Sequence, residues 1–289
     1  MWKRRGSIRA IYQPLDGRLG YHTPVIRRVF AAAPRLLILV SALFLGASYF
    51  TVRFPDVPGA GIGSFVSTFL IALPALAALL AYLGPAKAAL AFLALAAFGY
   101  AIETTGVVTG LPYGTFFYGD ALGPKLFGLV PFLLPISWAP LVLGAVAAAA
   151  PRPSYGRGAA RTIGWIFRSA VLLTLIDGVL DPGAASLGFW TWPEGGPYYG
   201  IPLSNYAGWL LSGALATALV LAFGRRRWGR VAPPPGMVDS AVIAVAFWVG
   251  VAVFSGLLFP AVLGAALFVY LLHRRLRLRN SGKRRGGAV

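Results

Sequence analysis

The residues from Ala88 to Glu103 read AALAFLALAAFGYAIE, an uncharged and almost wholly apolar run that ends in a carboxyl group. A helix needs about 20 apolar residues to cross a bilayer, and this run forms most of a predicted span, Ala86–Glu103. A carboxylate in hydrocarbon is costly unless it is paired, hydrated or protonated. No Lys or Arg in the outer half of the span can pair with Glu103. The stretch therefore predicts a membrane helix that carries a functional acid at its end.

Composition extends this prediction to the whole chain. Of 289 residues, 58% are hydrophobic, and the mean hydropathy is +0.73, far above a soluble domain. We predict an all-α fold, a polytopic integral membrane bundle of about eight transmembrane helices. The predicted spans are Leu36–Val52, Ser64–Leu83, Ala86–Glu103, Phe127–Ala150, Ile163–Asp181, Tyr206–Phe223, Val238–Phe254 and Leu258–His273. Ser255, Gly256 and Pro260 favour a break between the last two, and seven spans result if that stretch crosses once.

The basic residues predict how the chain is oriented. With eight spans, all but two of the 26 Lys and Arg residues fall on one side, and the other side holds only Arg53 and Lys125. The positive-inside rule then places both termini in the cytoplasm of a multi-pass cell-membrane protein. We predict a basic cytoplasmic segment over 1–35, a single transmembrane domain over 36–273 and a basic cytoplasmic tail over 274–289. This bias also accounts for the net charge of +18, so no nucleic-acid partner is expected.

The centre of the chain repeats itself in the same direction, over units of about 86–150 and 163–223. In the first unit an aromatic loop leads to Gly128-Leu-Val-Pro131, and Trp138 lies seven residues after the proline. In the second unit another aromatic loop leads to Gly200-Ile-Pro202, with Trp209 again seven residues on. Proline is favoured at a helix start, so both prolines are predicted to open a span. The two units predict a parallel helix–loop–helix pseudo-repeat.

Three acids in this region are candidate catalytic residues. Asp177, like Glu103, follows an uncharged run and has no basic partner in the outer half of its span. Asp181 is the third candidate, although it precedes Pro182, and a turn role at a helix end competes with chemistry there. Glu103 and Asp177 differ from the other acids of the chain because each follows an uncharged, apolar run.

The remaining acids and several tryptophans have structural interpretations. Asp120 and Glu194 are expected to be solvated in outer loops, and Asp239 is expected to cap the start of a span. Three tryptophans fit the aromatic belt of a membrane interface, namely Trp165, Trp228 and Trp248.

The two aromatic loops and the spans that follow them supply candidate substrate-binding side chains. The aromatic residues recur beside the acids rather than around all spans equally, which favours a pocket, and an interfacial belt is the alternative. The candidate substrate-binding residues are Tyr113, Phe117, Tyr118, Trp138, Trp190, Trp192, Tyr198, Tyr199, Asn205 and Trp209.

Acids walled by aromatic residues suit acid chemistry on an apolar substrate. Burial disfavours the charged form of a carboxyl group, which can then hold a proton and deliver it. A proton given to an electron-rich C=C bond leaves a carbocation, which Trp and Tyr faces stabilise by about 2 kcal/mol or more when desolvated. A second carboxylate can orient or deprotonate a water molecule that attacks the cation. Water addition and proton loss from a neighbouring carbon are the two natural outcomes.

Several motifs of this region resemble those of a membrane-bound carotenoid biosynthesis family. That family includes carotenoid hydratases of bacteria and the related C50 carotenoid hydratases of haloarchaea, and the resemblance covers roughly residues 86–213. The motifs are Glu103-x-x-Gly106, Gly110-Leu-Pro-Tyr-Gly-x-Phe-x-Tyr118, Leu122-Gly-Pro124, Asp177-x-x-x-Asp-Pro182, Trp190-x-Trp192 and Tyr198-Tyr-Gly-Ile-Pro-x-x-Asn205-x-x-Gly-Trp209.

The resemblance implies a hydratase that adds water across the terminal isopropylidene C=C of an acyclic carotenoid end group, of the lycopene or γ-carotene type or a C50 precursor. Two alternatives remain at this point. A lycopene-cyclase-like isomerase would start from the same proton, and a proton-coupled transporter would use Glu103 and Asp177 as a relay. The acids cluster on one side rather than tracing a path across the membrane, which disfavours transport.

No cofactor or metal is expected for hydration. The chain has no cysteine, and His22 and His273 lie in segments away from the acids, so no metal-ligand spacing appears. No glycine-rich phosphate loop is present in the sequence. The expected partners are the carotenoid substrate, water and the lipid bilayer, and association with other carotenoid enzymes is compatible with this interpretation.

Overall fold

A computed structural model describes residues 24–55, 57–152, 158–224 and 227–286 of the protein. The chain divides into two compact units, of which the first ends at Leu36 and the second begins at Leu37. The first unit contains the beginning of helix α1, and most of the predicted basic segment 1–35 lies outside the described residues. The second unit contains the remaining helices, the strands and all three candidate catalytic acids.

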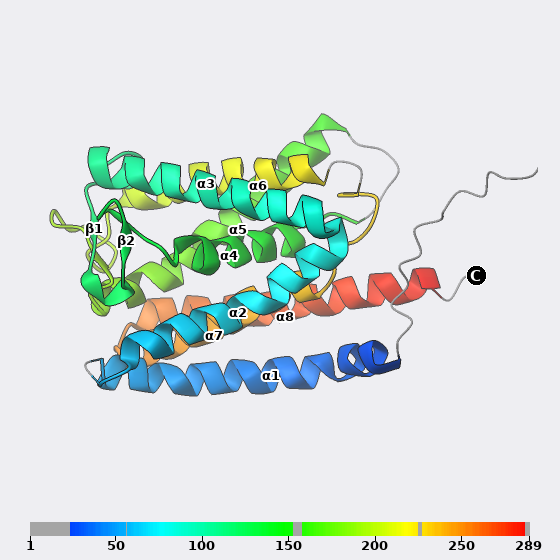
Figure 1. Cartoon of the computed structure of the whole chain (residues 1–289), viewed down its shortest axis with the longest axis horizontal. Coiled ribbons are helices and arrows are strands. Elements are labelled where there is room, and N and C mark those ends of the chain that lie inside the picture. Colours follow the sequence, from blue (N-terminus) through cyan, green and yellow to red (C-terminus); the bar gives the residue numbers. More distant parts are fainter. Residues whose placement is uncertain (1–23, 56, 153–157, 225–226, 287–289) are drawn as a thin grey trace, which may run out of the picture. The chain divides into compact units, whose positions relative to one another are not determined.

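Eight helices make up most of the described chain (Figure 1), and they confirm the predicted all-α membrane fold. They are α1 (Pro24–Arg53), α2 (Ala60–Leu83), α3 (Pro85–Thr109), α4 (Leu134–Ala148), α5 (Ala159–Ser186), α6 (Leu203–Phe223), α7 (Gly236–Phe254) and α8 (Leu258–Gly286). Among the described residues, seven are long and apolar enough to cross a membrane, and α4 is shorter. The predicted break between the last two spans is present, because residues 255–257 separate α7 from α8.

The predicted span Phe127–Ala150 is wrong in its first part. Strands β2 (Lys125–Leu126) and β3 (Val130–Pro131) pair as an antiparallel hairpin, and α4 begins only at Leu134. Gly128 has a positive φ of 72° within this hairpin, a conformation that glycine adopts without steric cost. Pro131 consequently lies in a strand rather than at a helix start, whereas Pro202 is the N-cap of α6.

The end of α5 also differs from the prediction. The helix continues through Pro182 to Ser186, so Asp181 lies inside α5 and does not occupy a turn at its end. Asp177 and Asp181 are four residues apart on a continuous helix, which places both side chains on one face. The turn role that competed with chemistry for Asp181 is therefore removed.

The short helix α4 is at the centre of the bundle. Every residue from Trp138 to Ala148 is buried, as expected for a helix that is apolar all round. Helices α2, α3, α5 and α7 all contact α4. Gly144 allows the closest approach, because a Cβ atom there would lie 2.6 Å from the Cβ of Ala241 on α7. Small residues at such crossings let membrane helices pack tightly.

Two of the tryptophans predicted for the interfacial belt lie instead in this core. Trp165 and Trp228 are buried, and their rings meet edge to face with centroids 5.8 Å apart. Each indole N–H reaches a backbone carbonyl, that of Val146 at 2.8 Å for Trp165 and that of Val220 at 3.0 Å for Trp228. A buried indole needs such a partner, and a hydropathy pattern does not indicate where one is available.

A second strand pair joins the aromatic loops of the two predicted pseudo-repeats. Strand β1 (Phe117–Tyr118) comes from the loop after α3, and β4 (Trp190–Thr191) comes from the loop after α5, and the two run antiparallel. The Gly119 N–H extends this pairing to the Phe189 carbonyl at 2.8 Å. A Cβ at Gly119 would lie 2.2 Å from the Gly188 carbonyl oxygen, so this close approach requires glycine. Figure 1 shows β1 and β2 at one end of the bundle, with the end of α8 at the opposite end.

Candidate active site

The three candidate acids lie inside the bundle near its loop-covered end. Glu103 is in the last third of α3, and Asp177 and Asp181 are on α5. Their exposed fractions are 8%, 1% and 2%. Among the described residues, none of the three has an ion-pair partner. Buried carboxyl groups without a cation must be protonated or hydrogen-bonded.

Asp177 and Asp181 form a buried pair of carboxyl groups that Asn205 bridges from α6. The Asn205 amide nitrogen Nδ2 lies 3.3 Å from Asp177 Oδ2 and 2.5 Å from Asp181 Oδ2. Both carboxyl groups are almost fully buried, at 1% and 2% exposure. Because two buried carboxylates around one amide disfavour each other's charge, one of the two is expected to carry a proton. The pair is therefore a proton store within the membrane domain.

The strand pair β1–β4 places one hydrogen-bond donor on an acid of each repeat unit. Tyr118 and Trp190 are register partners in this pair, with ring centroids 5.9 Å apart. The Tyr118 hydroxyl donates to Glu103 Oε2 at 2.8 Å, and the Trp190 indole Nε1–H donates to Asp181 Oδ1 at 3.1 Å. Each loop thus places an aromatic hydrogen-bond donor against an acid of the helix that precedes the loop.

The acid on α3 and the two acids on α5 interact electrostatically. Asp181 is within electrostatic range of Glu103, and Glu103 is within range of Asp177. Burial, together with the neighbouring Glu103 carboxyl, raises the pKa of Tyr118 well above its ordinary value. Tyr118 therefore remains a neutral hydrogen-bond donor at physiological pH. Glu103, Asp177 and Asp181 form a single cluster of three carboxyl groups, called the acid cluster below.

An aromatic cluster covers the acid cluster on the loop side. Its buried members are Tyr113, Phe116, Trp192 and Ile201, with Tyr118, Trp190, Tyr198, Tyr206 and Trp209 packed against them. Trp192 donates its indole N–H to the Tyr113 carbonyl at 3.2 Å, which links the two aromatic loops. Apolar walls of this kind accept an apolar substrate and keep bulk water out.

Two glycines of the motifs hold the ring of Tyr113. A Cβ at Gly106 on α3 would lie 2.7 Å from this ring, and a Cβ at Gly208 on α6 would lie 2.5 Å from it. Any larger residue at either position would push the ring away. Gly106 and Gly208 therefore leave room for the Tyr113 ring because they have no side chain.

Most of the predicted substrate-binding residues belong to this arrangement, and three lie outside it. Tyr113, Tyr118, Trp190, Trp192, Tyr198, Asn205 and Trp209 belong to the aromatic cluster or bond the acids. Phe117 and Tyr199 are exposed, and Phe117 alternates with Tyr118 along β1. Trp138 packs in the main core, 6.0 Å from the Phe98 ring.

Two residues of the site were not predicted from the sequence. Phe116 is buried between the rings of Tyr113 and Trp192, at centroid distances of 6.0 and 5.9 Å. Tyr206 lies within electrostatic range of both aspartates, and its hydroxyl is buried without a hydrogen-bond partner in the described structure. Neither had been given a role in the site. Phe116 is one of four aromatic residues in the motif Gly110–Tyr118, and Tyr206 directly follows Asn205 in another motif. The available sequence signal was proximity to these motifs.

The acids that were assigned structural roles lie away from the site. Asp120 and Glu194 are exposed in the loops, as predicted, and Asp120 forms an ion pair with Lys125 at 2.8 Å. That bond lowers the pKa of Asp120. The prediction for Asp239 is wrong, because it lies inside the first turn of α7 and bonds Arg275 Nε at 2.8 Å. Arg275 is only 2% exposed, so Asp239 neutralises a buried cation instead of capping a helix.

The fold and the site define a class of protein: a helical membrane protein that holds three buried carboxyl groups against an aromatic wall. Residues 61–271 match the family described as carotenoid biosynthesis protein, so the chain belongs to that family. A bisanhydrobacterioruberin hydratase from Haloarcula japonica is 42% identical over 207 residues, which is 69% of each chain. No solved structure matches the chain at a significant level.

Proposed function

We propose that the protein is a carotenoid hydratase that adds water across the terminal isopropylidene C=C of a carotenoid end group. The relative from Haloarcula japonica is named as a hydratase, and the family match covers the acid cluster and the aromatic cluster. The substrate is an acyclic end group of the lycopene or γ-carotene type or of a C50 precursor. The product is a tertiary alcohol, because water adds to the carbon that bears the methyl groups.

The observation that carries the proposal is the buried aspartate pair Asp177 and Asp181, which Asn205 bridges. Asp181 accepts from Trp190 and Asn205, whereas Asp177 accepts only the long bond from Asn205. Hydrogen bonds to the charged form favour it, so Asp181 is the carboxylate and Asp177 holds the proton. Asp177 Oδ1 is buried and has no partner among the described residues. This atom is free to face a substrate.

The proposed reaction is acid-catalysed hydration in two steps. Asp177 transfers its proton to the less substituted alkene carbon, and the C=C π electrons form the new C–H bond. The other carbon becomes a tertiary cation, which the Asp181 carboxylate and the faces of Trp190 and Tyr118 stabilise. Water then forms a C–O bond to the cation and gives a proton to Glu103. Proton transfer from Glu103 back to Asp177 through water completes the cycle, with no net redox change.

The attacking water has a proposed position beside Tyr206. A buried polar atom without a partner costs about 1–3 kcal/mol, so the Tyr206 hydroxyl is expected to bind a ligand. Aromatic side chains occupy most of the space around the Tyr206 hydroxyl, and water is small enough to fit beside it. The Tyr206 hydroxyl can accept a hydrogen bond from this water or donate one to it. Such a bond would hold the water close to the aspartate pair.

The test is product analysis in cells that make the candidate substrates. The protein is expressed in bacteria that accumulate lycopene, γ-carotene or a C50 carotenoid with an isopropylidene end, and the pigments are analysed by mass spectrometry. We expect a product heavier by one water molecule per modified end. A product of unchanged mass but altered retention would identify a cyclase-like isomerase. Unchanged pigment in all strains, with the protein folded in the membrane, would contradict the proposal.

We further propose that both termini, with their basic segments, are in the cytoplasm and that the acid cluster lies toward the outer side. The distribution of Lys and Arg supports this orientation. Cysteines introduced singly at the exposed positions Thr115 and Glu194 should react with an impermeant thiol reagent in intact cells. The chain has no native cysteine, so the background is low. Labelling that occurs only after lysis would invert the proposed orientation.

A further inference from the structure

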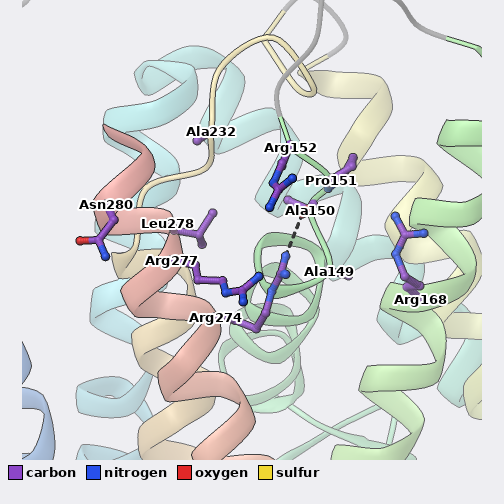
Figure 2. Close-up of a pocket in the computed structure, with 10 residues that line it drawn as sticks. All are labelled: Ala149, Ala150, Pro151, Arg152, Arg168, Ala232, Arg274, Arg277, Leu278 and Asn280. Carbon is purple, nitrogen blue, oxygen red and sulfur yellow. Dashed lines mark hydrogen bonds between the residues drawn. The ribbon is translucent and has the colours of Figure 1, made fainter. Parts of the chain in front are cut away.

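A cavity of about 710 Å³ lies at the end of the bundle opposite to the acid cluster. It is formed where α4 ends, beside the last turns of α8 and the first half of α5. Of the residues that the structure describes, four arginines line it, namely Arg152, Arg168, Arg274 and Arg277. Figure 2 shows Arg152, Arg274 and Arg277 close together, with Arg168 on the neighbouring helix. This arginine cavity is separate from the proposed active site.

The arginine cavity is strongly positive. Among the described residues, its lining contains no Asp or Glu. Asp239 lies on α7, which packs against α8, and is already bonded to Arg275 through both of its carboxylate oxygens. Guanidinium groups remain charged at all physiological pH values and bind phosphate through two parallel N–H bonds. The cavity is therefore complementary to a phosphate group.

Part of this arrangement is fixed before any ligand binds. Arg274 donates from Nε to the Ala148 carbonyl at 2.5 Å. It also donates from Nη2 to the Ala150 carbonyl at 2.8 Å, the bond drawn in Figure 2. Ala148 is the last residue of α4, where helices leave acceptors unsatisfied, and Ala150 follows the C-cap. Arg168 reaches back along α5, because a Cβ at Gly164 would lie 3.3 Å from its Nη1. Its guanidinium is thereby directed toward the end of the helix that borders the cavity.

An apolar groove continues from the same arginine. Arg168 also lines a groove of about 370 Å³ between α5 and α8, whose other lining residues are apolar except for Tyr270. Phe167 and Leu175 on α5 and Tyr270 on α8 are exposed side chains of this groove. Both helices are long and apolar enough to span a membrane. The groove therefore offers a hydrocarbon chain a path that begins beside a positive charge.

We propose that the arginine cavity and the groove together bind one anionic glycerophospholipid. Its phosphate lies among Arg152, Arg168, Arg274 and Arg277, and one hydrocarbon chain lies along the groove between α5 and α8. A free phosphate ion would use the cavity but not the groove, and a zwitterionic lipid would meet an excess of positive charge. The adjacency of the two features at Arg168 favours a lipid with net negative charge.

Binding is measured by native mass spectrometry on the full-length protein, purified and delipidated in neutral detergent. Phosphatidylglycerol is titrated against phosphatidylcholine, and we expect clear preference for the anionic lipid. The double variant Arg152→Gln/Arg168→Gln should weaken phosphatidylglycerol binding by about 30-fold. The control Arg53→Gln/Arg279→Gln removes the same charge outside the cavity and should retain wild-type binding. Equal binding of both lipids by the wild-type protein, or equal loss in both variants, would overturn the proposal.

The groove is tested separately from the charges. Ala266→Trp fills the groove, whereas Ala265→Trp adds the same ring to an exposed position that does not line it. We expect Ala266→Trp to weaken phosphatidylglycerol binding and Ala265→Trp to leave it unchanged. Glycerophosphoglycerol, which has the headgroup without hydrocarbon chains, should not displace the lipid at equal concentration. Displacement by this headgroup or by inorganic phosphate would show an anion site without a lipid chain and would overturn the proposal.

Discussion

Tyr198 supplies the hydrogen bond that Pro182 removes from helix α5. Proline has no backbone N–H, so the carbonyl four residues earlier, that of Gly178, loses its helical partner. The Tyr198 hydroxyl donates to this carbonyl at 2.8 Å. Since Gly178 lies between Asp177 and Asp181, this bond fixes the turn of helix that carries both acids. A tyrosine in the loop before α6 thus keeps the aspartate pair aligned while α5 passes through a proline.

Tyr198→Phe should destabilise the protein while leaving the aromatic ring in place. It leaves the Gly178 carbonyl without its partner, at an expected cost of about 0.6–1.7 kcal/mol for a hydrogen bond in a membrane protein. Thermal unfolding of the detergent-purified protein measures this loss. Tyr199→Phe is the matched control, because its exposed hydroxyl oxygen only accepts the Phe259 N–H at 3.3 Å. A melting temperature equal to that of the control would show that the Gly178 carbonyl does not need Tyr198.

Removal of a single acid should stop catalysis without unfolding the protein. We expect Asp177→Asn and Glu103→Gln each to lower product per folded molecule by about a hundredfold or more, the usual contribution of general acid–base catalysis. Asp181→Asn should also reduce turnover, because it removes the carboxylate that accepts from Trp190 and Asn205. Asp120→Asn is the control, since its carboxylate is exposed and pairs only with Lys125 among the described residues. Normal turnover in both Asp177→Asn and Glu103→Gln would refute the acid mechanism.

Gly208→Ala should reduce activity because it displaces the Tyr113 ring, although it removes no catalytic side chain. The new methyl would meet the Tyr113 ring at 2.5 Å, so the ring and its loop must move. We expect a large loss of product per folded molecule, with the protein still inserted in the membrane. Gly63→Ala on α2 is the matched control, because a Cβ there has no atom within 4 Å. If the two variants were equally active, the position of Tyr113 would not matter for turnover.

The helices, and the acids that lie within apolar sequence, could be recognised from the sequence because both depend on local patterns. Apolar runs require burial in lipid or protein, and a charged residue within such a run is recognisable without any knowledge of the fold. The start of α4 was mispredicted because the segment before it is equally apolar, and only the hairpin geometry at Gly128 distinguishes it from helix. The pairing of Tyr118 with Trp190 was also beyond prediction, since a two-residue strand pair across separate loops has no periodicity.

The ion pair of Asp239 with Arg275 illustrates the same limit. Thirty-six residues separate the partners, and each alone resembles an ordinary charge at the end of a span. From the sequence, Asp239 was expected to cap the start of a span, a role that asparagine also fills, and the structure gives it a different one. We now predict destabilisation of about 3 kcal/mol or more, because the variant leaves a buried guanidinium without its counter-ion.

The double variant Asp239→Leu/Arg275→Met separates the loss of the pair from the loss of one partner. Replacing both members of a buried pair by apolar residues is often neutral or stabilising, so we expect it to be more stable than Asp239→Asn alone. Thermal unfolding in detergent compares the two. A double variant as unstable as the single one would mean that the pair itself, and not the orphaned arginine, determines stability.

Trp209 offers the sharpest test of cation stabilisation by the aromatic wall. It packs against both the main core and the aromatic cluster, and its indole has no hydrogen bond within the described structure. Phenylalanine keeps a ring face at this position, whereas leucine keeps only the apolarity. A carbocation is attracted by a ring quadrupole, so Trp209→Phe should retain much more product per folded molecule than Trp209→Leu. Trp190 and Tyr118 are less suitable, because phenylalanine there would also remove a bond to an acid.

The same pair of substitutions at Trp138 provides the control. Trp138 is buried in the main core, so both Trp138→Phe and Trp138→Leu should lower stability and leave turnover per folded molecule similar to each other. Product is measured by mass spectrometry and divided by the folded fraction from size-exclusion chromatography in detergent. If Phe and Leu were equally active at Trp209, the face of Trp209 would play no part in stabilising the cation. That stabilisation would then have to come from the faces of Trp190 and Tyr118 and from the Asp181 carboxylate.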